Sequence, residues 1–259
     1  MREFIFLEID GFIATITINN PKKLNALSLN SWKDLARVIS SLRTNKKLRC
    51  VVLRGAGSKA FAAGADISEF PEKRSNAAQA ISYGEHVSRA LSELINCPIP
   101  IVAMIDGVCT GGGLEIACCC DIRISSELGR FGVPIKMIGH GFAPSEMRPA
   151  LQLLGPSVIL ELLLEGQIWD AEQALKRGLV NRVVAGHKLE QEVYKTANRI
   201  ADGAPLAARM TKKVLRMLMS GRHLSDKELK GSYQPCDSLD YQEGVRAFLA
   251  KVKPVFSGR

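Results

Sequence analysis

The chain has 259 residues, of which 46% are hydrophobic and 24% charged, and its formal net charge is +9. This composition is that of a globular chain, large for one domain and small for two, so we expect one core with an appendage. No charged-then-apolar leader precedes the first strand and no apolar run approaches ~18 residues, so we expect neither a signal peptide nor a membrane span and predict a cytoplasmic protein.

The positive charge does not indicate a nucleic-acid partner. Basic residues occur as scattered pairs such as Lys22-Lys23 and Lys212-Lys213, and only 6% of residues are aromatic. Because no basic stripe with interleaved aromatic side chains is present, solvated surface explains most of this charge.

The seven cysteines indicate a reducing environment. Cys118, Cys119 and Cys120 are consecutive on a predicted helix, and the others lack the spacing of disulfide or metal sites. We therefore expect reduced core cysteines and no metal.

The N-terminal segment predicts a hairpin followed by a helix. Residues Phe4 to Asn19 alternate in blocks around Asp10-Gly11, a dipeptide typical of hairpin turns. After a loop, Ser28 or Asn30 can cap a helix. Its apolar side chains, at helical spacing, are Trp32, Leu35, Ile39 and Leu42.

A β-branched strand, Cys50 to Leu53, leads into a loop of small residues, Gly55 to Phe70. Apolar residues from Ile81 to Ile95 then predict a helix, which Cys97-Pro98-Ile99-Pro100 ends.

The run Ile101 to Ile105 is continuously apolar and predicts a strand that is buried on both faces. Three glycines, Gly111 to Gly113, follow and precede good helix formers, so they lie at a helix N-terminus, where unpaired amides favour negative charge. Glu115 lies in the first turn of that helix, which favours its ionised form.

Both small-residue loops follow strands of one predicted parallel sheet. Such loops meet at the carboxyl edge of the sheet, where open α/β sheets bind ligands. Two amides that converge from separate loops on one oxygen would form an oxyanion hole.

The remaining segments predict a parallel α/β core and a helical end. Ile122-Arg123-Ile124 indicates a further strand, and the alternation of strands and helices argues for right-handed crossovers. Beyond Phe131 the chain consists of helical segments, with only Val180 to Val184 as a strand.

The chain resembles the crotonase superfamily, also called the enoyl-CoA hydratase/isomerase family, over nearly its whole length. The specific segments are Asn25-Ala26-Leu27, Ala60 to Ile67, and Asp106-Gly107 through Gly111-Gly112-Gly113-Leu114-Glu115 to Cys120-Asp121. The resemblance implies an α/β fold of the ClpP/crotonase type, with repeated ββα units and a C-terminal helical region for oligomerisation. We expect the core at residues 1–195, and the helical region, which also closes the CoA pocket, at residues 196–259.

The resemblance also implies the ligand and its binding residues. The substrate would be an acyl-CoA thioester of fatty acid metabolism, with coenzyme A as part of the substrate and no separate cofactor, in a homotrimer or homohexamer. The amides of Ala65 and Gly112 would hold the thioester oxygen. The expected substrate and CoA contacts are Lys23, Leu24, Ala26, Ala63, Gly64, Ala65, Asp66, Ile67, Gly112 and, from an adjacent subunit, Phe248 and Lys251. From its residue type alone, Asp66 is also expected to order its loop through backbone hydrogen bonds.

Glu115 matches the first of the two glutamates with which the family's hydratases add water. Ile135 occupies the place of the second, and it can act as neither acid nor base. Two residues could replace it: His140, which titrates near neutral pH, and Glu146, at the start of the next helix. For Glu146, helix capping is an equally good explanation.

Three functions remain open from the sequence. The first is an acyl-CoA enzyme of the enoyl-CoA hydratase/isomerase type, with Glu115 as the proton-transfer residue. The second is decarboxylation or thioester hydrolysis through the same enolate, and the third is a non-catalytic protein that binds CoA esters. Nothing in the sequence identifies the acyl group.

Overall fold

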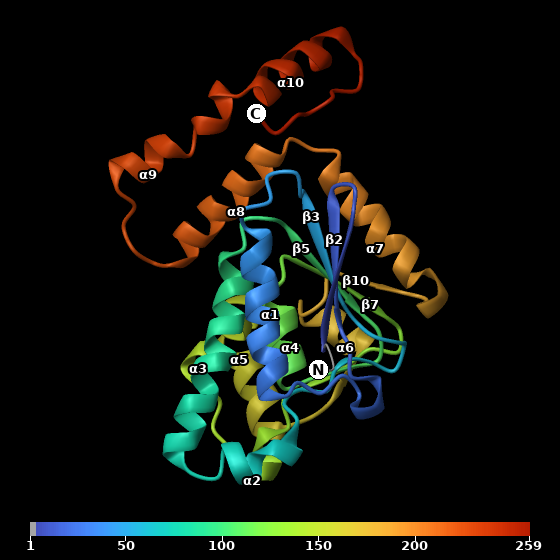
Figure 1. Cartoon of the computed structure of the whole chain (residues 1–259), viewed down its shortest axis with the longest axis vertical. Helices are drawn as coiled ribbons and strands as arrows, with labels where there is room; N and C mark the ends of the chain where they lie inside the picture. The colour runs from blue at the N-terminus through green and yellow to red at the C-terminus, as the bar shows by residue number, and fades with distance from the viewer. Residues whose placement is uncertain (1–3) are drawn as a thin grey trace.

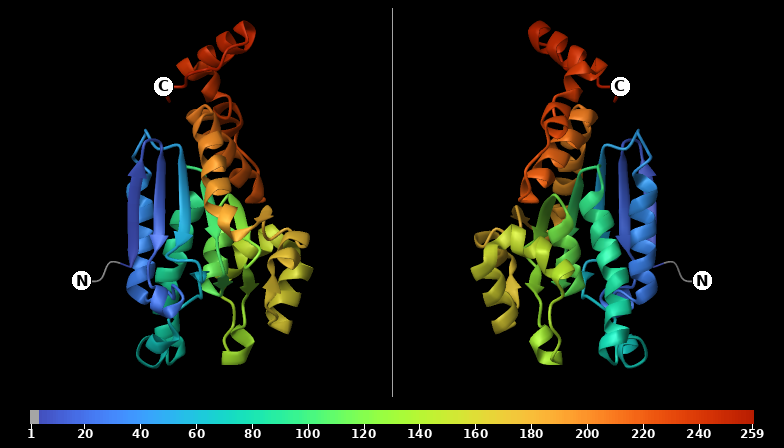
Figure 2. Two further views of the ribbon diagram at one scale, coloured as in Figure 1. Left: turned by 90° about the vertical axis from the view of Figure 1, so that its right-hand side faces the viewer. Right: turned by 90° about the vertical axis from the view of Figure 1, so that its left-hand side faces the viewer.

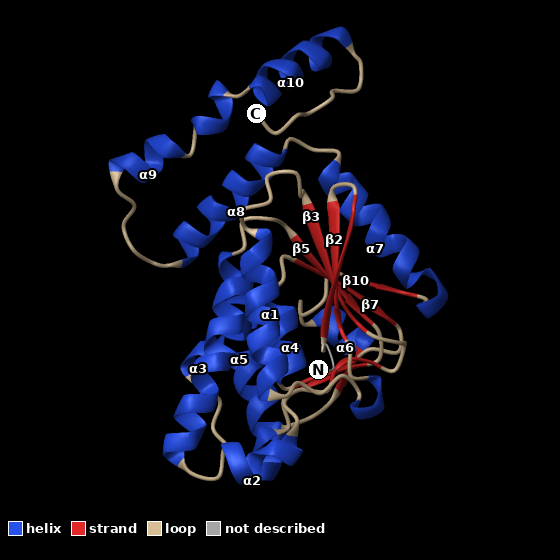
Figure 3. Cartoon of the chain, in the orientation of Figure 1, coloured by secondary structure: helices blue, strands red, loops and turns tan. Residues whose placement is uncertain are grey.

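The computed structural model describes residues 4–259 and shows two β-sheets with helices packed around them (Figures 1 and 3). In chain order the elements are β1 (Ile5–Asp10), β2 (Ile13–Ile18), α1 (Leu29–Leu42), β3 (Cys50–Gly55), β4 (Ala60–Ala62), α2 (Phe70–Lys73), α3 (Ala77–Asn96), β5 (Ile101–Ile105), β6 (Val108–Thr110), α4 (Gly112–Cys119), β7 (Ile122–Ser126), β8 (Arg130–Gly132), α5 (Pro144–Glu165), β9 (Trp169–Asp170), α6 (Ala171–Lys176), β10 (Arg182–Val184), α7 (Gly186–Ala201), α8 (Pro205–Met219), α9 (Asp226–Gly231) and α10 (Leu239–Ala250).

The larger sheet has six strands in the order β1-β2-β3-β5-β7-β10. The predicted N-terminal hairpin is confirmed, because β1 and β2 pair antiparallel around Asp10-Gly11. The remaining neighbours pair parallel, as the strand and helix alternation predicted. Ser28 caps α1 by accepting a hydrogen bond from the amide of Ser31, which confirms the predicted helix start.

The smaller sheet, in the order β4-β6-β8-β9, was not expected from the sequence. The prediction that both glycine loops directly follow strands of the large sheet is therefore wrong: β4 follows β3 and β6 follows β5, and the loops come after these short strands. Strands of two or three residues carry too little alternation to be seen in a sequence. The loops still meet, because β4 and β6 are parallel neighbours.

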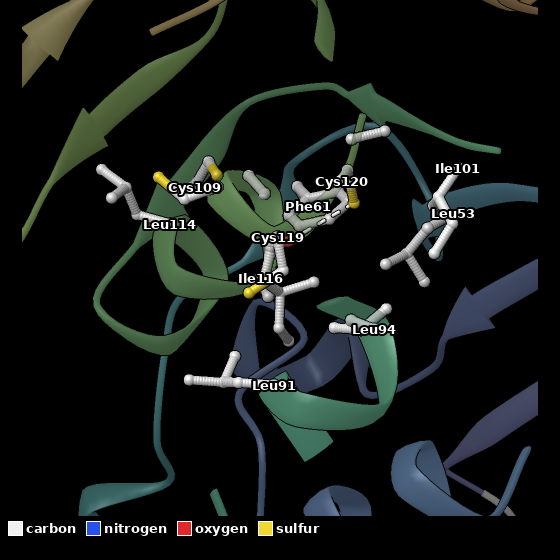
Figure 4. Close-up of a cluster of buried hydrophobic side chains, with 14 of the residues drawn as sticks. Leu53, Phe61, Leu91, Leu94, Ile101, Cys109, Leu114, Ile116, Cys119 and Cys120 are labelled. Atoms are coloured by element: carbon white, nitrogen blue, oxygen red, sulfur yellow. Dashed lines mark hydrogen bonds between the residues drawn. The ribbon is translucent and has the colours of Figure 1, made fainter. Parts of the chain in front are cut away.

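The central strands β3 and β5 of the large sheet are buried on both faces, which explains their uninterrupted apolar runs. On one face, Val51 and Leu53 join the main core with α1, α3, α4 and part of α5. On the other, Val52 and Val102 pack against α7. Figure 4 shows part of the main core, where Ile116 of α4 lies among side chains of α3 and of both sheets.

Six of the seven cysteines lie in the core, as predicted. Cys118, Cys119 and Cys120 are buried at the end of α4, whereas Cys236 is exposed. The reduced state of these thiols stays a prediction.

Helix α5 is long and apolar enough, by composition, to cross a membrane. In this structure it is kinked at Gly155, which has a φ of 76°, and it packs against α3 and α4. Its first turn reaches the wall of the candidate site, whereas Leu162 and Leu163 lie in the main core.

The last helices extend away from the sheets. Figures 1 and 2 show α8, α9 and α10 at one end of the molecule and α2 at the other. Helix α7 runs across the predicted boundary between residues 195 and 196, and its C-terminal part still contributes Ala197 and Ala201 to the core against the sheet.

Candidate active site

A cavity of about 240 Å³ lies where the two glycine loops meet. Its floor is the N-terminus of α4, and its walls come from α1, α2, α3, the short helix Ile135–Ile138 and the first turn of α5. The lining residues are mainly apolar: Trp32, Ala63, Gly64, Ala65, Ile67, Phe70, Arg74, Tyr83, Val87, Thr110, Gly111, Gly112, Glu115, Pro134, Ile135, Met137, Ile138, His140, Phe142 and Glu146.

Ala65 and Gly112 both line this cavity. Ala65 forms an isolated parallel bridge with Leu27, and Gly112 is the first residue of α4. Within residues 4–259 neither N–H donates to a backbone carbonyl. Two unpaired amides from separate loops are what an oxyanion hole requires.

The close approach of the two loops depends on glycine. Gly64 has a φ of +97°, and a Cβ there would lie 3.1 Å from the amide nitrogen of Gly112. A Cβ on Gly112 would lie 2.6 Å from the Trp32 ring. Larger residues would therefore separate the two amides or push the ring into the cavity.

Buried polar side chains hold the first loop in place. The Asn25 side chain donates to the carbonyls of Ala56 and Ala60. As predicted, Asp66 orders its own loop by accepting from the amide of Ser68, and it pairs with Lys23 at 2.7 Å. The Lys23 and Ser68 contacts hold the pKa of Asp66 below its usual value against the opposing effect of burial.

Glu115 is only 6% exposed and lines the cavity one turn into α4. Burial raises the pKa of its carboxyl well above the usual value, and the nearby Glu146 raises this pKa further, while Arg74 lowers it. From the sequence we predicted that the helix dipole favours the ionised form of Glu115. In the structure, the effect of desolvation outweighs that of the dipole.

Glu146 faces the same cavity from α5 and is 5% exposed. One of its oxygens accepts from the amide of Ala143 at 3.3 Å, so the capping interpretation is correct as well. Burial raises the pKa of Glu146, whereas the Ala143 amide and Arg74 lower it. The structure thus brings two carboxyl groups together although Ile135, also in the lining, replaces a glutamate.

His140 lies in the cavity wall, where its Nε2 contacts the guanidinium of Arg74. Burial lowers the pKa of His140, and the Arg74 charge lowers it further, so the ring is neutral near pH 7. Its Nε2 then accepts a hydrogen bond from Arg74.

The residues expected to contact the CoA nucleotide lie in two separate parts of the chain's structure. Lys23 and Leu24 lie beside the first loop, with the Lys23 amine engaged by Asp66. Phe248 is 84% exposed on α10, at the far end of the molecule from α2, so it does not line the cavity of its own chain (Figure 1). Lys251 ends α10 beside it.

Comparisons with known proteins agree with this geometry. The family model described as enoyl-CoA hydratase/isomerase matches residues 8–259. The chain belongs to this family, the crotonase superfamily. A solved structure of an enoyl-CoA hydratase/carnithine racemase from Magnetospirillum magneticum has a TM-score of 0.98 with 46% identity and covers 100% of this chain and 97% of its own.

Curated relatives of this crotonase-superfamily member have different activities. A short-chain-enoyl-CoA hydratase of Clostridium acetobutylicum is 36% identical over 82% of this chain and 80% of its own. The methylmalonyl-CoA decarboxylase of Escherichia coli is 34% identical over 95% of each chain. Membership therefore establishes an enzyme family that acts on acyl-CoA. The reaction itself has to be inferred from the residues of the site.

The sequence did not reveal most of the cavity wall. Trp32 and Val87 were predicted only as apolar residues of helices, yet they line the cavity. Tyr83 and Arg74, which also line it, were assigned no role from the sequence. No local signal marks such residues, because the cavity forms only when α1, α2 and α3 pack around α4.

Proposed function

We propose that the protein is an enoyl-CoA hydratase in which Glu115 and Glu146 together add water to the double bond. The observation that carries this proposal is the pair of buried carboxyl groups beside two unpaired amides in one cavity. The amides of Ala65 and Gly112 would hold the thioester oxygen and stabilise the enolate that forms when the β carbon is attacked.

The pair would hold one proton between its two members, because two carboxylates in a desolvated site cannot both ionise readily. The amide of Ala143 donates to Glu146 and so favours its ionised form, and in the proposed mechanism Glu146 is therefore the base and Glu115 holds the proton. Glu146 takes a proton from water as its oxygen bonds to the β carbon, and Glu115 gives its proton to the α carbon. Proton exchange between the two carboxyls then restores the starting state.

Glu146 is a better second group than His140. Nε2 of the neutral His140 already accepts a hydrogen bond from Arg74. One oxygen of Glu146 has no such partner, since Ala143 contacts only the other.

The test is turnover of crotonyl-CoA, followed by loss of the conjugated thioester absorbance and by product mass. The wild type should add one water, and Glu115→Gln and Glu146→Gln should each lower kcat by ~10²- to 10⁴-fold. The matched control is Glu85→Gln, an exposed glutamate on α3 outside the cavity, which should keep wild-type activity. Full activity of Glu146→Gln would contradict the two-carboxyl mechanism.

Double-bond isomerisation needs only one proton-transfer group, so it is the outcome expected if Glu146 is a capping residue alone. It would appear as conversion of a 3-enoyl-CoA without a change in mass, in wild type and Glu146→Gln alike. Decarboxylation is a second candidate, supported by the related methylmalonyl-CoA decarboxylase. A product lighter by carbon dioxide would identify it, and binding of CoA esters without any turnover would support a non-catalytic protein.

We further propose that the enzyme acts in the cytoplasm as a homotrimer or homohexamer. The distance of α10 from the cavity of its own chain supports a contribution of Phe248 and Lys251 to the CoA site of a neighbouring subunit (Figure 2).

A further inference from the structure

Arg74 brings a cation into a cavity that is otherwise lined mainly by apolar side chains. It follows the last residue of α2, and its guanidinium lies 4.9 Å from the ring centre of Phe70 and 5.3 Å from that of Tyr83. Cation–π contacts with two rings hold the group in one place. They leave most of its N–H donors unused, since stacking occupies the face of the guanidinium and not its edge.

No carboxylate of the described chain, residues 4–259, forms a salt bridge with Arg74. Its neighbour Lys73, by contrast, pairs with Glu69 at 2.5 Å. Among the described residues, the single side chain to which Arg74 hydrogen-bonds is the neutral His140. Its charge nevertheless reaches the cavity, because it lowers the pKa of Glu115, of Glu146 and of His140.

A guanidinium in a largely apolar cavity costs free energy unless an anion meets it. Its planar fork of N–H donors fits a carboxylate in a bidentate arrangement. Lys23 and Leu24, expected at the CoA nucleotide, do not line this cavity, whereas Arg74 lines it together with Glu115 and Glu146. A ligand anion that meets Arg74 in this cavity would therefore belong to the acyl part, beside the reacting carbons, and would add to the charge interaction of Arg74 with Glu115 and Glu146.

We propose that Arg74 binds a second carboxylate, at the far end of the acyl group, so that the substrate is the CoA monothioester of a short unsaturated dicarboxylic acid. This inference rests on the proposed function, since it names the substrate class of that site. The stacked position of Arg74 over Phe70 and Tyr83 and its lack of an internal carboxylate partner carry it.

The experiment measures equilibrium binding of saturated thioesters, which cannot react, by isothermal titration calorimetry. Wild type should bind glutaryl-CoA at least tenfold more tightly than pentanoyl-CoA, which has the same chain length without the carboxylate. A tenfold preference is the size of effect expected for one charge-assisted pair. Arg74→Met should abolish this preference and leave the affinity for pentanoyl-CoA within about threefold of the wild-type value. Arg74→Lys should keep part of it, because a lysine keeps the charge without the fork.

The matched control is Lys73→Met, which removes the adjacent cation but leaves the cavity lining unchanged. It should keep the wild-type preference. Equal affinity of the wild type for the two thioesters would overturn the proposal, as would an Arg74→Met variant that binds both of them more weakly by the same factor. The second result would assign Arg74 a purely structural role.

Turnover separates this inference from the proposed function. Wild type should hydrate glutaconyl-CoA with a higher kcat/KM than crotonyl-CoA, and Arg74→Met should reverse that order mainly through KM. If neither thioester is hydrated but glutaryl-CoA is still preferred in calorimetry, the hydratase proposal fails and the carboxylate site stands. If crotonyl-CoA is hydrated and no preference is measured, the carboxylate site fails alone.

Discussion

At the scale of single residues, the chemistry of the site depends on desolvation. Glu115 and Glu146 are both nearly inaccessible, and burial is the largest cause of the raised pKa of each. A carboxyl in this environment keeps its proton at a pH where an exposed glutamate has lost it. The two side chains can therefore divide the roles of acid and base, which one exposed glutamate could not do.

The raised pKa values predict a cost in stability at neutral pH. Above the ordinary glutamate value of 4.5, the unfolded chain loses the proton of Glu115 while the folded chain retains it. Folded protein then binds more protons than unfolded protein, so its free energy of unfolding falls as pH rises. Glu115→Gln has no proton to lose, so it should lose less stability than wild type when the pH rises from 4 to 8.

Urea unfolding of wild type and Glu115→Gln at the two pH values measures this difference. Glu85→Gln, on the exposed face of α3, is the control and should follow wild type at both. A stability difference that does not change with pH would show that Glu115 is not held in its protonated form.

At the scale of elements, the site exists because two short strands bring two loops into contact. Strands β4 and β6 pair in parallel, and the loops after them place Gly64 against Gly111 and Gly112. The N-terminus of α4 supplies one unpaired amide, and the isolated bridge between Leu27 and Ala65 orients the other. Neither loop forms an oxyanion hole without the other.

Gly112→Ala tests this arrangement. The added Cβ would lie 2.6 Å from Trp32 and 3.6 Å from Gly64, so the ring or the loop must shift. Because one oxyanion donor is worth ~10²- to 10³-fold in rate, we expect kcat for crotonyl-CoA to fall by about that factor. Gly141→Ala is the matched control, since a Cβ on Gly141 meets nothing within 4 Å. Unchanged kcat in Gly112→Ala would argue against the Gly112 amide as a donor.

At the scale of the whole molecule, the exposed apolar surface of the C-terminal helices is the main unexplained feature of a single chain. Phe248, Leu249 and Val255 are between 76% and 84% exposed and lie on or just after α10. Exposed apolar patches mark protein interfaces, and these three side chains are close in the sequence. It agrees with the proposed oligomer, in which a neighbouring subunit covers these side chains.

Lys251 and Lys253 form a matched pair for testing the expected CoA contact from a neighbouring subunit. Lys253 pairs with Asp202 at 2.9 Å within its own chain, whereas no salt bridge within residues 4–259 involves Lys251. Lys251→Ala should raise KM for crotonyl-CoA about two- to fivefold without changing kcat, the effect of losing one exposed ion pair. Lys253→Ala should change neither. Sedimentation velocity should give a trimer or hexamer for both variants, and equal KM values would remove Lys251 from the CoA site.

The sequence by itself determined the main elements and the chemistry of the loops. Apolar periodicity and turn residues predicted the hairpin at Asp10-Gly11, helix α1 with its Ser28 cap and the buried strand β5, because these patterns are local. The glycine loops and Glu115 were also evident, but their role came from the resemblance to the family's segments, since glycines before a helix are explained equally well by helix packing or a tight turn.

Tertiary structure alone decided what surrounds Glu115. Whether Glu146 caps a helix or faces Glu115 depends on how α5 packs against α4, and the sequence left both interpretations open; in the structure it does both. The Arg74 side chain is positioned in the cavity by packing on the rings of Phe70 and Tyr83, which belong to two different helices. The physical reason is that burial and proximity set the pKa and the partners of a side chain, and both arise only when distant segments pack together.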